Sequence, residues 1–590
     1  MTDLRRELGF TRTEEILLGH DVASRHPHYV SMRDLKETSV HAVGAAGYGK
    51  SFFLRSVIDQ LISAGQFFGL LEPHKELYEY ALWRLRRRGV RPERIVLLDP
   101  GDSRFSLGFN PLACGVTDAG ETSSLVIDAF KKAWGGGASS FDSTPRLERT
   151  LRGLFRMLID SRLSLLEGYD VLNPDNVHLR RALSERVTDR LVQQDWREFE
   201  RLPRNEKVVL VESSRNRLAR VLHALPLQSM LGQTEGTLDL RDVLDSGKFL
   251  LANLGGISAP ETQRLVGSLL MNGIYHAAKQ RNSRHRRSWF LICDEFGQFA
   301  TADFANSLDE LRKFGVHLIL AHQRLHQLER EDPDIASAVM TNAKIKVVFG
   351  GLDRKESERM SRELFTGEVH GERVKHISKA TKFRPVFDTF TVETESETET
   401  DSDSFGWGQS EGHSASTSAG DSSSRWMKED GIVEEDDRIL MNGSLASQSA
   451  ESASVSSSGS RGSSRSRGSS RSVVPITRNE EFEEETSRQF YSVEEEWERH
   501  VSTVHGLPKR EALVRVYAGP VLRIRTADVE PERRDERFKQ FQTTVLERCP
   551  QVKTTKVVAL QIEVRRREIA ALAEANETAG RPFEVRSFRE

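Results

Sequence analysis

A glycine-rich stretch near the start of the chain has the residues of a phosphate-binding loop. The sequence GAAGYGKS begins at Gly44 and ends with Gly49, Lys50 and Ser51. Backbone N–H groups of such a loop, with Gly47 at its turn, cradle phosphates at the start of a helix. Lys50 is expected to reach the β- and γ-phosphates, and Ser51 is expected to bind Mg²⁺. The spacing therefore predicts a site for a nucleoside triphosphate.

Two carboxylates follow an apolar run much later in the chain. The sequence FLICDEFGQF places Asp294 and Glu295 at the predicted end of a strand. A carboxylate at this position holds the Mg²⁺ ion with its water shell, and a neighbouring one polarises the attacking water. We assign the first role to Asp294 and the second to Glu295. A base for water favours hydrolysis over transfer to a substrate hydroxyl. Alone, an Asp-Glu pair after a strand is often only the start of a helix.

Gln323 and Arg312 are two further candidates in the sequence LRKFGVHLILAHQ. Gln323 ends the next apolar run, where an amide can sense the γ-phosphate and transmit its loss to neighbouring loops. The alternative for Gln323 is an ordinary surface glutamine. Arg312 precedes the run and can project into the site of a neighbouring subunit, as an arginine finger does. The alternative for Arg312 is an ordinary surface arginine.

Short apolar runs alternate with helical patterns and must position these residues. The predicted strands are 39–45, 66–73, 94–100, 248–254, 288–294, 316–322 and 344–350. The predicted helices that follow several of them are 50–64, 75–89, 260–281, 302–314 and 353–365. This alternation is typical of an α/β fold with a parallel-rich central sheet covered on both faces.

The rest of the chain divides by composition. Residues 1–36 form a lead segment, and 37–113 and 237–390 form two parts of the α/β domain. Between these parts, 114–236 has helical patterns without a strand pair and predicts an inserted all-α domain. Residues 391–475 are acidic and Ser-rich, so we expect disorder. Residues 476–590 return to two closing strands around Gly519-Pro520 and a helical tail.

Bulk properties exclude several classes of protein. The net charge of −3 for 590 residues does not suit a general polyanion binder. The three cysteines form no CxxC pair, which fits a reducing cytoplasm and gives no metal site. No run of about 18 apolar residues is present, so we expect no membrane span. We therefore expect a cytoplasmic protein that partners recruit to the inner membrane when its function needs it.

Two basic clusters offer contacts to DNA phosphates. They are RLRRRGVRPER at 84–94 and KQRNSRHRR at 279–287. Such contacts carry no sequence preference and make binding depend steeply on salt. The alternative, which each cluster taken singly favours, is a solvated helix end, where cations are stabilised by the helix dipole. No base-reading motif, aromatic stacking platform or zinc module is evident.

The order of these motifs resembles the HerA/FtsK superfamily of DNA-pumping ATPases. Within it the chain is most similar to TraG/TraD-type coupling proteins of conjugative type IV secretion. The stretches that support this are EEILLGHDV, LLEPHKELYEY, VLLDPGD with FNPLA, CDEFGQF, MTNAKIKVVFGGLDRKESERMSREL and LPKREALVRVYAGPVLRIRT. They cover most of 10–390 and about 488–530.

The resemblance implies a RecA-like P-loop ATPase fold with an inserted all-α domain. It also implies ATP and Mg²⁺ as cofactors, a homo-hexameric ring, DNA in its channel, and relaxase or secretion components as protein partners. Three residues depart from the family pattern: Glu72 and Lys75 replace an Asp and a Gly, and Arg324 follows Gln323. The absent membrane anchor and the Ser-rich insertion are further departures.

Three functions remain open from the sequence. The first is a ring-forming, ATP-hydrolysing DNA translocase in conjugative transfer. The second is a HerA-like ring that works with a partner nuclease in phage defence or DNA end processing, which the missing anchor suits. The third is an ATP-dependent protein-docking scaffold, for which DNA is incidental. A small-molecule kinase is disfavoured, because no lid or acceptor pocket is evident.

Overall fold

The computed structural model describes residues 14–578, with gaps at 114–117, 135–144, 302–303, 305–307, 327, 329–332, 369–373, 401–422 and 428–463. The chain forms two compact units, which we call the core unit and the ribbon unit. The core unit contains Met1–His370 and Val493–Glu590, and the ribbon unit contains Gly371–Ser492. None of the described helices is long and apolar enough to cross a membrane.

An 11-stranded sheet is the centre of the core unit. Seven neighbouring strands are parallel, in the order β10 (Ile345–Phe349), β3 (Val40–Val43), β9 (Val316–His322), β8 (Trp289–Cys293), β4 (Phe67–Glu72), β7 (Phe249–Asn253) and β5 (Ile95–Leu98). Four antiparallel strands continue the sheet beyond β10, namely β14 (Glu511–Val516), β15 (Leu522–Arg525), β1 (Glu15–Asp21) and β2 (Pro27–Ser31). Each apolar run predicted as a strand forms one, and the predicted α/β class with a parallel-rich sheet is confirmed.

The parallel strands are buried along their whole length, as helices cover the sheet. The connecting helices are α2 (Met32–Glu37), α3 (Lys50–Ser63), α4 (Glu76–Arg87), α13 (Leu240–Ser246), α14 (Pro260–Lys279), α16 (Leu308–Leu311), α18 (Pro333–Asn342) and α19 (Arg354–Phe365). The 3-10 turns are η1 (Pro92–Arg94), η2 (Pro111–Ala113), η3 (Leu254–Gly256), η4 (Ser283–His285), η5 (Phe296–Gln298) and η6 (Arg312–Phe314). Strand packing is close where the Trp289 indole lies over Gly69, since a Cβ there would approach Trp289 to 2.2 Å.

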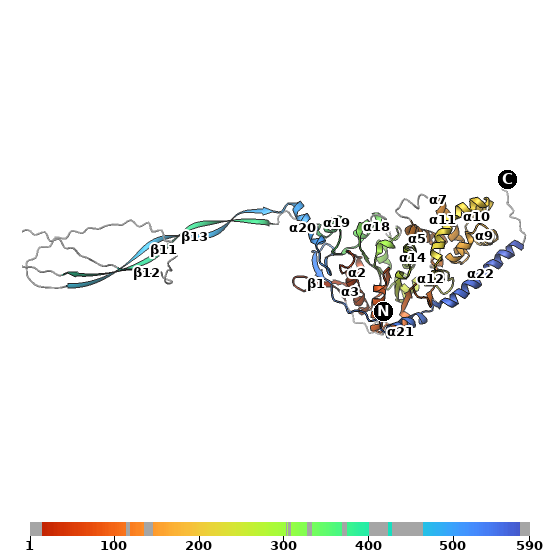
Figure 1. The fold of residues 1–590 in the computed structure, drawn as a ribbon, viewed down its shortest axis with the longest axis horizontal. Helices are drawn as coiled ribbons and strands as arrows, with labels where there is room; N and C mark the ends of the chain where they lie inside the picture. Colours follow the sequence, from red (N-terminus) through yellow and green to blue (C-terminus); the bar gives the residue numbers. More distant parts are fainter. Residues whose placement is uncertain are drawn as a thin grey trace, which may run out of the picture. The chain divides into compact units, whose positions relative to one another are not determined.

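Every described element between residues 118 and 236 is a helix. These are α5 (Ala119–Trp134), α7 (Pro145–Asp160), α8 (Leu165–Val171), α9 (Val177–Ser184), α10 (Arg190–Arg201), α11 (Arg204–Leu222) and α12 (Leu225–Leu231). Helix α14 is buried over most of its length and packs against α5 of the helical region and α13 of the α/β part. The helical region packs on the sheet through this contact (Figure 1).

The C-terminal part of the chain ties the core unit together. Helix α20 (Val493–His505) packs on α19, and β14 then pairs with β10. Helix α21 (Glu536–Arg548) lies against α4, and β16 (Val552–Thr554) pairs with β6 (Phe105–Leu107). Helix α22 (Thr555–Thr578) runs along α9 in the helical region (Figure 1), where the Arg565 guanidinium donates to Glu167 over 2.8 Å.

The ribbon unit is a long antiparallel pair of strands (Figure 1). Strand β11 (Val374–Thr400) pairs with β13 (Ser464–Phe490), and β12 (Ser423–Met427) adds to β11 on its other edge. The structure therefore corrects the disorder predicted for 391–475, since 391–400, 423–427 and 464–475 lie in strands. The remainder of that segment lies outside the described residues. Opposed charges explain the difference, because Arg471 on β13 forms an ion pair with Glu393 on β11.

Candidate nucleotide site at the carboxyl edge of the sheet

The glycine-rich loop joins β3 to α3 at the carboxyl edge of the parallel strands. Gly47 and Gly49 have φ angles of 80° and 115°, which favour glycine. A Cβ on Gly49 would lie 2.8 Å from the Cα of Arg510, so this glycine is also required by a close approach of another segment. The Arg510 N–H donates to the Tyr48 carbonyl over 2.7 Å. The loop is thus held in place by the C-terminal part of the chain.

Lys50 meets both predicted carboxylates. Its Nζ lies 2.9 Å from Glu295 Oε1 and 3.7 Å from Asp294 Oδ1. All three side chains are buried, with 5% of each residue exposed. The three are brought together because β8 and β3 are parallel strands separated only by β9, so that their carboxyl ends lie at the same edge. The structure therefore unites three residues that the sequence separates by more than half of the core unit.

Asp294 has the properties of a cation ligand. Its Oδ1 is buried and has no hydrogen-bond partner. Burial raises the pKa of this carboxyl above its ordinary value, and the nearby Lys50 opposes that rise. Two carboxylates and one lysine leave a buried negative charge, which a divalent cation would compensate. Ser51 follows Lys50 in the first turn of α3 and is partly exposed, so the donor set fits Mg²⁺ held by few protein ligands together with phosphates.

Glu295 has an unusual backbone. Its φ of 52° lies in the left-handed region, which costs a non-glycine residue about 1–3 kcal/mol. The residue immediately precedes η5, and the N–H of Gln298 donates to its carbonyl over 2.9 Å. This conformation turns the Glu295 side chain to Lys50, and strain of this kind is concentrated at functional sites.

Glu72 is a buried acid beside the site that the sequence did not identify as a candidate. It ends β4, next to β8, and accepts from the backbone N–H groups of Leu77 (2.7 Å) and Tyr78 (2.5 Å). Burial raises its pKa to about 7, the two N–H groups oppose this rise, and the charge of Asp294 adds to it. The sequence did contain an indication of this acid. Glu72 ends an apolar run and stands where the family that the chain resembles has an Asp.

Gln323 follows β9, between the strands that carry the loop and the carboxylates. The preceding residue, His322, has its carbonyl 3.4 Å from the N–H of Gly44 in the loop. The rings of His322 and His41 stack, with 2.5 Å between their Nε2 atoms. Burial lowers the pKa of His322 to about 4 and that of His41 well below its ordinary value. No pattern in the sequence indicated this neutral histidine pair, which joins β3 to β9 next to Gln323.

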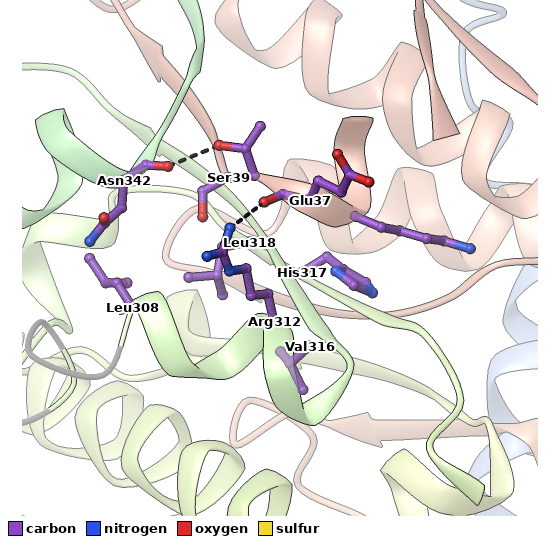
Figure 2. A pocket seen from close by; sticks show the side chains of 10 residues that line it. Glu37, Ser39, Leu308, Arg312, Val316, His317, Leu318 and Asn342 are labelled. Carbon is purple, nitrogen blue, oxygen red and sulfur yellow. Dashed lines mark hydrogen bonds between the residues drawn. The ribbon is translucent and has the colours of Figure 1, made fainter. Parts of the chain in front are cut away.

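Arg312 lies at the opposite edge of the sheet from the loop of its own chain. It begins η6, just before β9, whereas Gln323 follows the end of that strand. Seven strand residues span roughly 20 Å. The Arg312 guanidinium donates to the Glu37 carbonyl over 2.9 Å at a small hollow (Figure 2). Figure 2 shows Arg312 with Val316, Leu308 and Asn342 around this hollow. Within one chain, the structure does not bring Arg312 to the nucleotide site.

The first basic cluster, 84–94, is neutralised by acidic neighbours. Arg84 pairs with Asp59 on α3 and with Glu530, and Arg87 also pairs with Glu530. Arg86 lies 3.6 Å from Asp535 at the start of α21. These pairs favour a structural role for this cluster over a DNA contact.

The second basic cluster, 279–287, is engaged with backbone carbonyls. The buried guanidinium of Arg281 lies 2.8 Å from Asp245 and donates to the carbonyl oxygens of Phe314 (2.9 Å) and Arg287 (2.8 Å). Arg286 donates to the Lys313 carbonyl over 2.7 Å. These contacts support the turn before β8, so this cluster also has a structural role.

The chain thus has an α/β fold with a parallel-rich sheet, and a glycine-rich loop, a lysine and two carboxylates meet at the carboxyl edge of that sheet. In sequence, residues 289–432 match the family model described as the TraM recognition site of TraD and TraG. The matched segment contains Asp294, Glu295, Arg312 and Gln323. The match confirms the resemblance to TraG/TraD-type proteins over this segment. No curated protein matches the chain in sequence.

Solved structures with similar folds include coupling proteins. The unbound bacterial conjugative coupling protein TrwBΔN70 has 14% identity and a TM-score of 0.49, with 90% of this chain and 93% of that chain covered. TrwB in complex with ADP and Mg²⁺ has 17% identity and a TM-score of 0.42, with 61% and 80% covered. VirB4 of Thermoanaerobacter pseudethanolicus has 13% identity and a TM-score of 0.43, with 60% and 89% covered.

Proposed function

We propose that the chain hydrolyses ATP with Mg²⁺ at the carboxyl edge of its sheet. The observation that carries this proposal is the buried contact of Lys50 with Asp294 and Glu295 beside the glycine-rich loop. Lys50 binds the β- and γ-phosphates, Ser51 and Asp294 hold Mg²⁺, and Glu295 takes a proton from the attacking water. The ion supplies positive charge that stabilises the transferred phosphoryl group.

The pairing of Lys50 with Glu295 implies that phosphate binding precedes activation of the base. The Lys50 ammonium donates to Glu295 over 2.9 Å in the structure. Phosphates that attract Lys50 would release the Glu295 carboxylate, which then becomes available as a base. The base is therefore blocked until the γ-phosphate arrives, which limits unproductive chemistry. Gln323, at the end of the strand between β3 and β8, is positioned to respond to loss of that phosphate.

We infer that ATP hydrolysis drives a ring of these chains along DNA in conjugative transfer of the type IV secretion kind. The match of residues 289–432 to the TraD and TraG model supports this inference. The name of that model also makes a TraM-like protein a candidate partner of this segment. Because both basic clusters are engaged in contacts within the chain, the DNA-contacting residues are to be sought on other surfaces of the ring.

ATPase measurements with and without DNA test this function. Phosphate release is measured for the full chain with no DNA, with single-stranded DNA and with double-stranded DNA. We expect stimulation by at least one form, which falls steeply as salt rises. Absence of stimulation by both forms would contradict the translocase. A Lys50→Ala chain that still supports transfer would favour the docking scaffold instead.

Arg312 is proposed to complete the site of the neighbouring subunit. Its distance from the loop of its own chain suits action in trans, and loss of an arginine finger reduces the rate by about 10³–10⁵. Arg312→Ala and Lys50→Ala chains should each be inactive. Mixed together, they should regain activity, because roughly a quarter of the interfaces would combine an intact Lys50 with an intact Arg312. Lys313→Ala, one position along, is the matched control and should stay active.

A further inference from the structure

The ribbon unit has no core of its own. None of the described side chains between Val374 and Phe490 is buried. Large apolar side chains are open to solvent on one face of the ribbon, where Phe383, Phe387 and Val473 are 60%, 81% and 62% exposed. An isolated two-stranded ribbon is only marginally stable in water, and more strands are needed for independent stability. Additional strands would therefore stabilise the ribbon.

The two edges of the ribbon are unpaired over the same length. Strand β12 pairs with β11 only between Thr391 and Glu395. The outer edge of β11 is thus open among the described residues from Val374 to Phe390. Within the ribbon, this stretch of β11 pairs with residues 474–490 of β13. Among the described residues, no strand pairs with the outer edge of β13 either. An open edge presents backbone N–H and C=O groups that another strand can pair with.

Charge distinguishes these two open edges. From Val374 to Thr391, β11 carries four basic residues and one acidic residue. From Val473 to Phe490, β13 carries five acidic residues and two basic residues. Within one ribbon these charges meet across the strands, as in the pair of Lys379 with Glu483 at 2.7 Å.

The same charges choose between the possible partners for each edge. Two ribbons that met through β11 and β11, or through β13 and β13, would oppose like charges, which is destabilising. When a basic β11 edge meets an acidic β13 edge, opposite charges face each other along both strands. This contact is head-to-tail, and head-to-tail contacts form a ring when the rotation between neighbouring copies closes. In a ring all ribbons point the same way, so β13 of one copy runs antiparallel to β11 of the next.

We propose that the ribbons of neighbouring copies of this chain pair edge to edge, β13 of one with β11 of the next, to form a closed antiparallel collar. This inference rests on the proposed ring. Pro385 and Pro475 each remove one N–H donor, so we expect a ladder that is interrupted once on each strand. The partner of the ribbon is therefore a second copy of the chain, recognised by complementary charge.

Two full-length charge variants test the proposal. The first, Lys379→Glu with Lys382→Glu, makes both edges acidic. The second, Glu483→Lys with Glu484→Lys, makes both edges basic. Each variant alone has like charges on the edges that must meet, whereas a mixture of the two offers opposite charges between copies. The strands within each ribbon still repel in the mixture, so any recovery must come from contacts between chains.

Zero-length carbodiimide cross-linking with mass spectrometry provides the measurement. We expect cross-links in the mixture that join position 379 or 382 of one variant to position 483 or 484 of the other, and their loss in each variant alone. Such a link joins two chains by necessity, since each variant carries a single sign of charge at these four positions. A chain with all four substitutions should assemble like the wild type, which shows that the substitutions are tolerated.

Sedimentation with a non-hydrolysable ATP analogue separates the two proposals. A ring with the expected cross-links supports the collar. A wild-type ring without cross-links in the variant mixture, or with links only between like strands, overturns the collar and leaves the proposed ATPase function standing. A wild-type chain that stays monomeric with nucleotide and DNA overturns the ring, and the collar with it.

Discussion

Replacement of Glu295 by Gln separates the chemistry of the site from its binding function. The change keeps the size of the side chain and an oxygen that can accept from Lys50. It removes the carboxylate that lies 2.9 Å from the Lys50 ammonium, and it leaves Asp294 to hold the cation. We therefore expect the variant to fold, to bind ATP and to fail in hydrolysis.

The magnitude follows from the role of Glu295 as a base. Loss of a general base reduces a rate by about 10²–10⁴, and each tenfold loss corresponds to about 1.4 kcal/mol in the barrier. ATP affinity should stay constant or rise by up to about tenfold, or about 1.4 kcal/mol. The rise is expected because a neutral amide competes less well than a carboxylate for the Lys50 ammonium.

Two measurements on the same protein check this prediction. Phosphate release gives the rate at saturating ATP, and titration with a fluorescent nucleotide gives the affinity. Glu310→Gln is the matched control, since this partly buried glutamate accepts from the Tyr275 hydroxyl over 3.1 Å, away from Lys50. A Glu295→Gln chain that kept more than a tenth of the wild-type rate would refute the assignment of the base. Loss of nucleotide binding would show that the residue is needed for structure instead.

Three further predictions concern stability and pH. Gly49→Ala should abolish nucleotide binding and lower the melting temperature, because φ is 115° and the Cβ would lie 2.8 Å from the Arg510 Cα. Gly47→Ala is also strained, since φ is 80°, but it should lower the melting temperature less because no atom lies within 4 Å of its Cβ. Arg281→Ala should lower the unfolding free energy, measured by denaturant titration, by about 3 kcal/mol. The control is Arg241→Ala, since this exposed arginine also pairs with Asp245; it should lower the unfolding free energy by about 1 kcal/mol or less. Glu72 has its pKa raised from 4.5 to about 7, so the folded chain holds this proton while the unfolded chain loses it, and stability should fall as pH rises from 4.5 to 7. The difference in unfolding free energy between wild type and Glu72→Gln should change by on the order of 3 kcal/mol across that window; a difference that stays constant with pH would contradict the raised pKa.

Local patterns in the sequence were sufficient for the strands and for the residues at the site. Buried parallel strands are continuous apolar runs, and the residues that follow them lie at one edge, so Lys50, Asp294 and Glu295 were predictable as a group. The sequence was not sufficient for Glu72, whose raised pKa depends on burial that only the packed chain creates. The His41–His322 pair is likewise a contact between strands that are far apart in sequence.

The ribbon unit shows where composition misleads. Its Ser-rich and acidic composition predicted disorder, because such residues bury little apolar surface. In TESETET from Thr394, however, the Thr residues recur at even spacings, which places these β-branched residues on one face of a strand. Opposite charges face each other across the two strands, as in the pair of Arg471 with Glu393, and a composition average cannot detect such pairs.

The contact of Arg510 with the glycine-rich loop has a consequence for biosynthesis. Strand β14 follows Arg510 and lies beside β10, although the whole ribbon unit separates them in the chain. Arg510 donates to Tyr48 in the loop and to the Thr526 and Ala527 carbonyls over 3.1 and 3.3 Å. A ribosome must therefore synthesise the residues up to Arg510, including the whole ribbon unit, before the loop gains its support. A growing chain, or one cut short before Arg510, would present the glycine-rich loop without that support.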